Sequence, residues 1–201
     1  MAEVILFHHA HGRTAGVLAF ADQIRNAGHT VHVPDLYDGR VFGDLEAGLA
    51  YARDVGFETI IERGLLAAKT LPNNLVYAGF SLGVLPAQKL AQTSPGALGA
   101  MLFHACVRFE EFGSSWPQDV PVQVHAMEDD EWFVKGGDLA AARELAAGAS
   151  NVELFLYTGH QHLFADSSLP SYDESAAGLL IQRVLVFLDG CRRKRLLHNG
   201  K

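Results

Sequence analysis

Ser81 is the residue whose surroundings point most directly to chemistry. It stands in the middle of Gly79-Phe80-Ser81-Leu82-Gly83, after an apolar run that begins at Leu75. This pattern between a strand and a helix is typical of a sharp turn that exposes a nucleophilic hydroxyl, with glycines where the strand and the helix approach each other closely. The backbone N–H of Leu82 would then face an oxyanion formed during attack. The same residues could also form an ordinary glycine-rich turn.

A serine nucleophile needs a histidine that takes its proton and a carboxylate that orients the imidazole. Two histidines, His160 and His162, follow the last apolar run of strand type. Acidic residues follow an earlier run, and the candidates are Glu128, Asp129, Asp130 and Glu131. Serine, acid and histidine therefore occur in the chain order of an α/β-hydrolase triad, each just after a predicted strand. Spacing alone selects neither one acid nor one histidine.

The elements that must position these residues are apolar runs separated by intervals of helix length. Strands are predicted at residues 4–8, 30–33, 98–105, 120–126 and 152–157, and in the apolar run that starts at Leu75 and breaks at Gly79. Helices are predicted at 15–26, in two pieces between 42 and 70 with a break near Gly56, and at 82–93, 138–147 and 172–188. Continuously apolar strands are typical of a sheet buried on both faces. We therefore expect an α/β fold with a doubly wound, mostly parallel sheet flanked by helices, whose functional loops follow the strands.

Length and spacing predict a single domain. The chain has 201 residues, which suits one domain, and we expect it to span residues 1–190, followed by a basic C-terminal tail at 191–201. The segment between Asp35 and Leu75 leaves little room for a separate cap domain. The sequence therefore predicts an open site for small substrates.

Composition argues against several classes of partner. The chain has 16 basic and 23 acidic residues, a net charge of -7, which disfavours nucleic acid. Its two cysteines lie far apart, which favours a reducing compartment and argues against a thiolate metal site. The first apolar run is too short for a signal peptide or a membrane span. We expect a cytoplasmic protein that binds neither nucleic acid nor membrane, and its oligomeric state stays open.

Four motifs resemble those of the dienelactone hydrolase family of α/β-hydrolases. They are Pro34-Asp35-Leu36-Tyr37, Gly79-Phe80-Ser81-Leu82-Gly83, His125-Ala126-Met127-Glu128-Asp129-Asp130 and Tyr157-Thr158-Gly159-His160-Gln161-His162-Leu163-Phe164. The resemblance covers most of the chain and implies the α/β-hydrolase fold. It implies that Asp130 is the acid and His162 the base, and that the N–H of Ala10 joins that of Leu82 in an oxyanion hole. By the same match, His160 belongs to the pocket or the surface.

The chain departs from this family at two positions. Ser81 stands where the namesake members have cysteine, and His9 stands where they have a glutamate that helps to activate the thiol. The two changes fit together because a hydroxyl needs full general-base help, whereas a thiol can be stored as a thiolate. In that family, arginines bind the carboxylate of the substrate. The motifs do not identify the matching arginines in this sequence, and the candidates are Arg13, Arg40 and Arg53. A neutral ester or lactone is therefore as good a candidate substrate as an anionic one.

Other polar and aromatic residues near the predicted strand ends are candidates for the substrate pocket. These are His9, His11, Tyr37, Trp132, Phe133 and Phe164; the aromatic ones could equally belong to the core. The cluster of His8, His9 and His11 suggests metal binding, since imidazole is a common zinc ligand. Adjacent histidines on an extended chain point to opposite sides, so we expect a pocket or loop role and no metal.

These observations together predict a serine hydrolase of small carboxylic esters or lactones. Ser81 would form an acyl-enzyme that water releases, and this chemistry requires no cofactor. The alternative is a binding module with the same fold and little turnover, because a fold does not determine function.

Overall fold

The computed structural model describes the backbone of residues 1–198 and the side chains of residues 1–192. Its centre is a six-stranded sheet with the order β2-β1-β3-β4-β5-β6, in which every pair of neighbours is parallel. The strands are β1 (Glu3–Phe7), β2 (Thr30–His32), β3 (Val76–Phe80), β4 (Gly99–Phe103), β5 (Val122–Met127) and β6 (Val152–Tyr157). The predicted α/β fold is confirmed.

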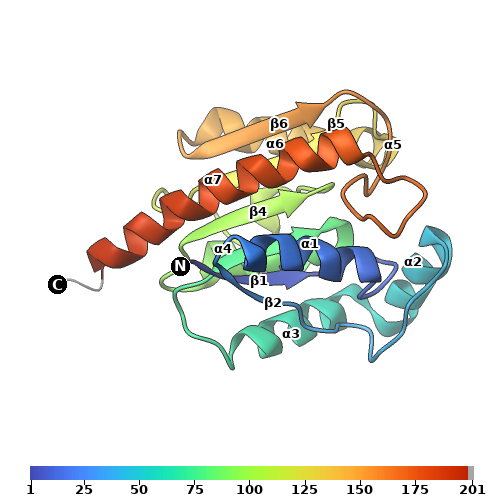
Figure 1. Ribbon diagram of the computed structural model, residues 1–201, viewed down its shortest axis with the longest axis horizontal. Coiled ribbons are helices and arrows are strands. Elements are labelled where there is room, and N and C mark those ends of the chain that lie inside the picture. The colour runs from blue at the N-terminus through green and yellow to red at the C-terminus, as the bar shows by residue number, and fades with distance from the viewer. Residues whose placement is uncertain (199–201) are drawn as a thin grey trace.

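Helices cover both faces of this sheet (Figure 1). They are α1 (Ala15–Asn26), α2 (Leu45–Val55), α3 (Phe57–Ala68), α4 (Val84–Thr93), α5 (Glu131–Lys135), α6 (Asp138–Gly148) and α7 (Glu174–His198). Helices α1 and α7 pack on one face, and α2, α3, α4 and α6 contribute to the core on the other face. The sheet is therefore doubly wound, and the helices between β2 and β3 pack on it without forming a separate cap domain.

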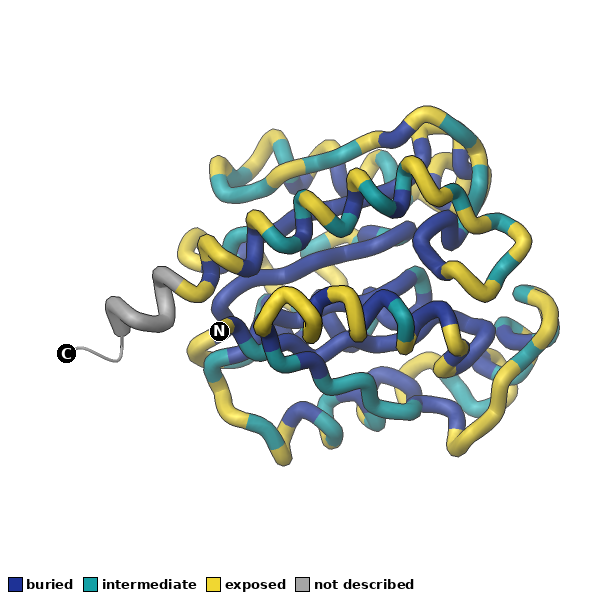
Figure 2. The backbone as a smooth tube through the Cα atoms, viewed as in Figure 1, coloured by how far each residue is buried: buried dark blue, intermediate teal, exposed yellow. Residues whose placement is uncertain are grey.

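Alternation along the strands explains why the core has two halves. Val4 and Leu6 of β1 join the cluster under α1 and α7, whereas Ile5 and Phe7 join the cluster on the opposite face. Successive side chains of a strand point to opposite faces, so a strand buried on both sides is apolar along most of its length. Figure 2 shows the central strands as buried along their length, while the edge strand β6 is largely intermediate or exposed.

Two elements differ from the sequence prediction. Helix α5 was not expected, because five residues are too few for a periodic apolar pattern to be visible. Helix α7 continues to His198, beyond the predicted end at residue 188, because residues 191–198 contain many good helix formers and no proline. Residues 191–198 of the predicted basic tail are thus helical, and 199–201 lie outside the described residues. The assignment of one domain to residues 1–190 stays a prediction.

None of the helices within residues 1–198 is both long and apolar enough to cross a membrane.

Candidate active site

Ser81 lies at a strained turn between β3 and α4. Its φ is 47°, a left-handed conformation that is costly for a residue with a side chain. The turn is also tightly packed: a Cβ at Gly79 would overlap the carbonyl of Gly83, and a Cβ at Gly83 would overlap the carbonyl of Phe7. Both glycines are therefore required by close backbone approach, and together they hold Ser81 above the carboxyl end of β3.

The structure brings Ser81, His162 and Asp130 together from three separate loops. His162 Nε2 lies 3.0 Å from Ser81 Oγ, and His162 Nδ1 lies 2.7 Å from Asp130 Oδ2. With the proton on Nδ1, the imidazole donates to the carboxylate and accepts from the hydroxyl. This arrangement can remove the proton of Ser81 during attack on an acyl carbon and stabilise the resulting imidazolium.

The two oxygens of Asp130 contact different partners. While Oδ2 faces His162, Oδ1 accepts hydrogen bonds from the amides of Trp132 at 3.0 Å and Phe133 at 3.5 Å, so Asp130 caps the N-terminus of α5. The residue is fully buried. Glu131, one of the other acidic candidates, pairs instead with Lys135. Capping thus fixes the direction in which the free oxygen of Asp130 points.

The acid loop and the histidine loop are joined by their backbones. The amide of Glu128 donates to the carbonyl of Tyr157 at 2.9 Å, and the amide of Asp129 donates to that of Gly159 at 3.0 Å. His160 is exposed, whereas the side chain of His162 is only 11% exposed. The loop therefore turns His162 toward the protein interior and leaves His160 facing solvent.

The two predicted oxyanion donors come from different loops. Leu82 is in the short 3-10 turn Ser81–Gly83, and Ala10 is fully buried in the loop between β1 and α1. A Cβ at Gly48 would overlap the carbonyl of Ala10, so α2 packs directly against this loop. The hydrogen bonds of the described residues include none donated by the Ala10 amide.

The histidines of the first loop are held by hydrogen bonds. His8 Nδ1 lies 2.8 Å from the carbonyl of His9, and His8 Nε2 accepts from the amide of Leu36 at 2.9 Å. Burial lowers the pKa of His8 to about 4, so the ring is neutral near pH 7. The described residues contain no group of three or more side chains placed to hold a metal ion.

The residues predicted to line the pocket occupy different environments. Four are fully covered by protein, and these are His9, Tyr37, Phe133 and Phe164. Tyr37, for example, donates its hydroxyl to the carbonyl of Gly48 at 3.2 Å. Trp132 is 45% exposed, and its ring centroid lies 6.0 Å from that of His162. The buried rings of Tyr37, Phe133 and Phe164 belong to the two hydrophobic clusters on the faces of the sheet.

A cavity of about 310 Å³ opens beside His162. Its lining residues are mostly apolar and come from the loop after β1, the start of α2 and the loop after β6: His11, Leu45, His162, Leu163, Leu169, Pro170 and Ser171. Figure 1 shows this loop and α2 at the end of the molecule to which the arrowheads of β1, β4 and β6 point. Of the predicted pocket residues, His11 is the one that lines this cavity.

The site residues predicted from the sequence do not include two buried polar residues near His162. Asp166 forms hydrogen bonds with His9 and Thr14. His104 packs edge-on to His162 with centroids 5.8 Å apart, and neither of its ring nitrogens has a partner among the described residues. Asp166 follows His162 by four positions, but no local pattern distinguishes it from a surface aspartate.

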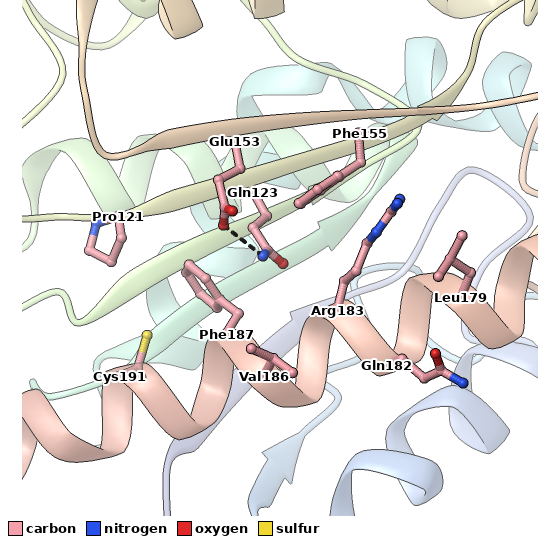
Figure 3. Close-up of a pocket in the computed structure, with 11 residues that line it drawn as sticks. Pro121, Gln123, Glu153, Phe155, Leu179, Gln182, Arg183, Val186, Phe187 and Cys191 are labelled. Atoms are coloured by element: carbon pink, nitrogen blue, oxygen red, sulfur yellow. Dashed lines mark hydrogen bonds between the residues drawn. The ribbon is translucent and has the colours of Figure 1, made fainter.

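A second cavity, of about 570 Å³, lies between α7 and strands β5 and β6 (Figure 3). Val186 and Phe187 of α7 line it together with Phe155 of β6, and Gln123 donates to Glu153 on its floor at 2.9 Å. This cavity shares no residue with the one beside His162.

A family model matches nearly the whole chain, and solved structures share its fold. The sequence model of the dienelactone hydrolase family matches residues 1–191. None of the curated proteins matches the sequence. Among solved structures, a protein named m3DLH has a TM-score of 0.73 and 17% identity, covering 94% of this chain and 86% of its own.

Two further solved structures show the same fold. P91, a dienelactone hydrolase-like promiscuous phosphotriesterase from metagenomic libraries, has a TM-score of 0.71 and 17% identity, covering 95% of this chain and 87% of its own. Carboxyl esterase 2 of the fungus Tuber melanosporum has a TM-score of 0.65 and 13% identity, covering 94% and 77%.

Proposed function

Since the chain belongs to the dienelactone hydrolase family and is a hydrolase with the α/β-hydrolase fold, we propose that it is a serine hydrolase of small, neutral carboxylic esters or lactones. Ser81 is the nucleophile in place of the family's cysteine, His162 is the general base, and Asp130 orients His162. The observation that carries this proposal is the pair of hydrogen bonds of His162, 3.0 Å to Ser81 and 2.7 Å to Asp130.

The reaction proceeds through two acyl transfers. Ser81 Oγ attacks the acyl carbon while His162 Nε2 takes its proton, and the N–H groups of Ala10 and Leu82 hold the oxyanion. The intermediate collapses by breaking the acyl C–O bond, and His162 returns the proton to the leaving oxygen. A water molecule then attacks the acyl-enzyme with the same base and releases the acid.

The cavity beside His162 supports a neutral substrate. Apart from the two histidines, its lining contains only apolar side chains and one serine, and a carboxylate there would lose hydration without gaining a cation. Two of the candidate arginines have other partners: Arg13 lies 3.9 Å from Asp35, and Arg40 lies over the ring of Tyr51. A volume of about 310 Å³ suits a short acyl or alkoxy group.

Hydrolysis of short-chain p-nitrophenyl esters tests this proposal. We expect turnover by the wild type and a loss of at least about 10³-fold in kcat/KM for Ser81→Ala and for His162→Ala. A fluorophosphonate should label the wild type at Ser81 and leave Ser81→Ala unlabelled. His160→Ala is the matched control, because it removes an exposed histidine of the same loop and should stay within about twofold of the wild type.

A wild type that neither turns over esters nor reacts with the phosphonate would overturn the assignment and favour a binding module with the same fold. Paraoxon should be included in the substrate panel, because one protein of this fold is described as a phosphotriesterase. Turnover of paraoxon without turnover of any carboxylic ester would contradict the substrate class.

A further inference from the structure

A second histidine and carboxylate pair lies buried beside the candidate triad. His9 Nε2 is 2.7 Å from Asp166 Oδ2, and both side chains have zero exposure. The two residues are 157 positions apart. His9 belongs to the loop after β1, and Asp166 to the loop after β6. The pair therefore joins the loop of Ala10 to the loop of His162.

The carboxylate of Asp166 is surrounded by hydrogen-bond donors. Besides His9, Oδ2 accepts from Thr14 Oγ1 at 2.5 Å, and Oδ1 accepts from Ser168 N at 2.8 Å and Ser168 Oγ at 2.6 Å. A Cβ at Gly16 would overlap Oδ1. Burial alone would raise the pKa of Asp166, but the bonds from His9, Ser168 and Thr14 outweigh it and lower the pKa to about 2. Asp166 is therefore an anion at neutral pH.

The partners of His9 agree on one tautomer of its ring. Burial lowers the pKa of His9, so the ring is neutral, and the anionic carboxylate at Nε2 requires the proton there. Nδ1 then carries a lone pair, and it accepts the amide of His11 at 3.3 Å. Both nitrogens of His9 are occupied, so this ring cannot also serve as a proton acceptor for Ser81.

The contacts of His9 and Asp166 lie next to the proposed oxyanion donor Ala10 and to the segments that carry Ser81 and His162. The amide held by His9 is adjacent in the chain to that of Ala10, the proposed oxyanion donor. The ring of His9 packs edge-on to Phe80, the residue before Ser81, at 6.2 Å. The amide of Asp166 donates to the carbonyl of Leu163 at 3.0 Å, within the turn that carries His162.

We propose that Asp166 and His9 are positioning residues for the oxyanion hole, an inference that rests on the proposed function. Asp166 holds His9 in the Nε2–H tautomer, and Nδ1 of His9 holds the amide of His11, which fixes the direction of the neighbouring Ala10 N–H. Donors aimed in advance at the developing charge act without reorganisation during the reaction.

Asp166→Asn tests the proposal by changing the tautomer that His9 must adopt. The fixed backbone amide of Ser168 keeps the oxygen of Asn on its side, so the amide –NH₂ faces His9 Nε2. His9 must then carry its proton on Nδ1 and can no longer accept from His11. We expect kcat to fall about 10- to 100-fold while KM changes less than about threefold. Affinity for an alkylboronic acid, whose tetrahedral adduct mimics the intermediate, should fall by a similar factor.

Ser168→Ala is the matched control. It removes the Ser168 Oγ bonds to Asp166 and from Gly16 but leaves the bond between Asp166 and His9. We expect this variant to keep kcat within about threefold of the wild type even if its melting temperature falls as far as that of Asp166→Asn. Equal kcat in the two variants would overturn the inference.

A measurement on the wild type does not depend on either variant folding. Long-range ¹H–¹⁵N correlation spectra should show His9 as a neutral Nε2–H ring at pH 7; an Nδ1–H ring or an imidazolium would overturn the inference. A wild type without esterase activity overturns the proposed function and this inference with it. An active wild type with an equally active Asp166→Asn overturns this inference alone.

Discussion

Asp130 has two tasks that a single substitution can separate. In Asp130→Asn, Oδ1 can still cap α5, because asparagine is as good an N-cap as aspartate. The –NH₂ group would then face His162 Nδ1 and favour the wrong tautomer. We expect kcat to fall by about 10³- to 10⁴-fold while the free energy of unfolding changes by less than about 1 kcal/mol. Ester hydrolysis and urea unfolding measure the two effects.

Asp130→Ala serves as the comparison, since it loses both tasks. It should show a similar loss of kcat and an additional loss of about 1 kcal/mol in stability from the missing cap. An Asp130→Asn variant that keeps most of its activity would show that another acid orients His162, with Asp129 and Glu128 as the next candidates.

At the scale of elements, the packing of α2 against the loop after β6 sets the size of the cavity beside His162. Leu45 is the residue of α2 that lines the cavity. Leu45→Ala enlarges it and should raise the ratio of kcat/KM for butyrate over acetate esters, whereas Leu45→Phe should lower that ratio. A methylene group in such a pocket contributes about 1–3 kcal/mol to discrimination, so shifts of about tenfold are expected.

Leu66→Ala controls for the loss of a leucine from this part of the chain. Leu66 lies on α3, is 64% exposed and is not among the residues that line the cavity. The Leu66→Ala variant should therefore have the same ratio of kcat/KM for butyrate over acetate esters as the wild type. An unchanged ratio in both Leu45 variants would show that the acyl group binds elsewhere.

At the scale of the whole molecule, several buried histidines link stability to pH. Burial lowers the pKa of His8 to about 4 and of His125 to about 3, and the pKa of His104 lies well below its usual value for the same reason. Histidines of the unfolded chain bind protons near pH 6.5. Below that pH the unfolded state binds more protons than the folded state, so stability falls as pH falls.

Urea unfolding at pH 7.5 and pH 5.5 measures this effect. We expect each of these three histidines to cost about 1 kcal/mol of stability between the two pH values. His104→Leu is the best variant for a control, because neither nitrogen of His104 has a partner among the described residues. In this variant the unfolded state should bind about one proton less in excess of the folded state, so the unfolding free energy should depend less on pH. Equal stability of the wild type at both pH values would contradict the prediction.

The sequence by itself determined the features that depend on neighbours along the chain. Strands buried on both faces are apolar along most of their length, so the number of strands and the doubly wound sheet could be predicted from apolar runs. The glycines around Ser81 also made the turn predictable, because close backbone approach leaves no room for a Cβ there. Short elements could not be predicted in this way, because a helix such as α5 has too few residues to show a periodic pattern.

Only the tertiary structure decided which distant side chains meet. Residue spacing left two histidines and four acids, and the path of the loops after β5 and β6 brings one of each into contact. The contact between His9 and Asp166 spans 157 positions, and no pattern in the sequence marks Asp166 as the partner of His9. Such contacts depend on strand order and loop path together, and local sequence constrains neither.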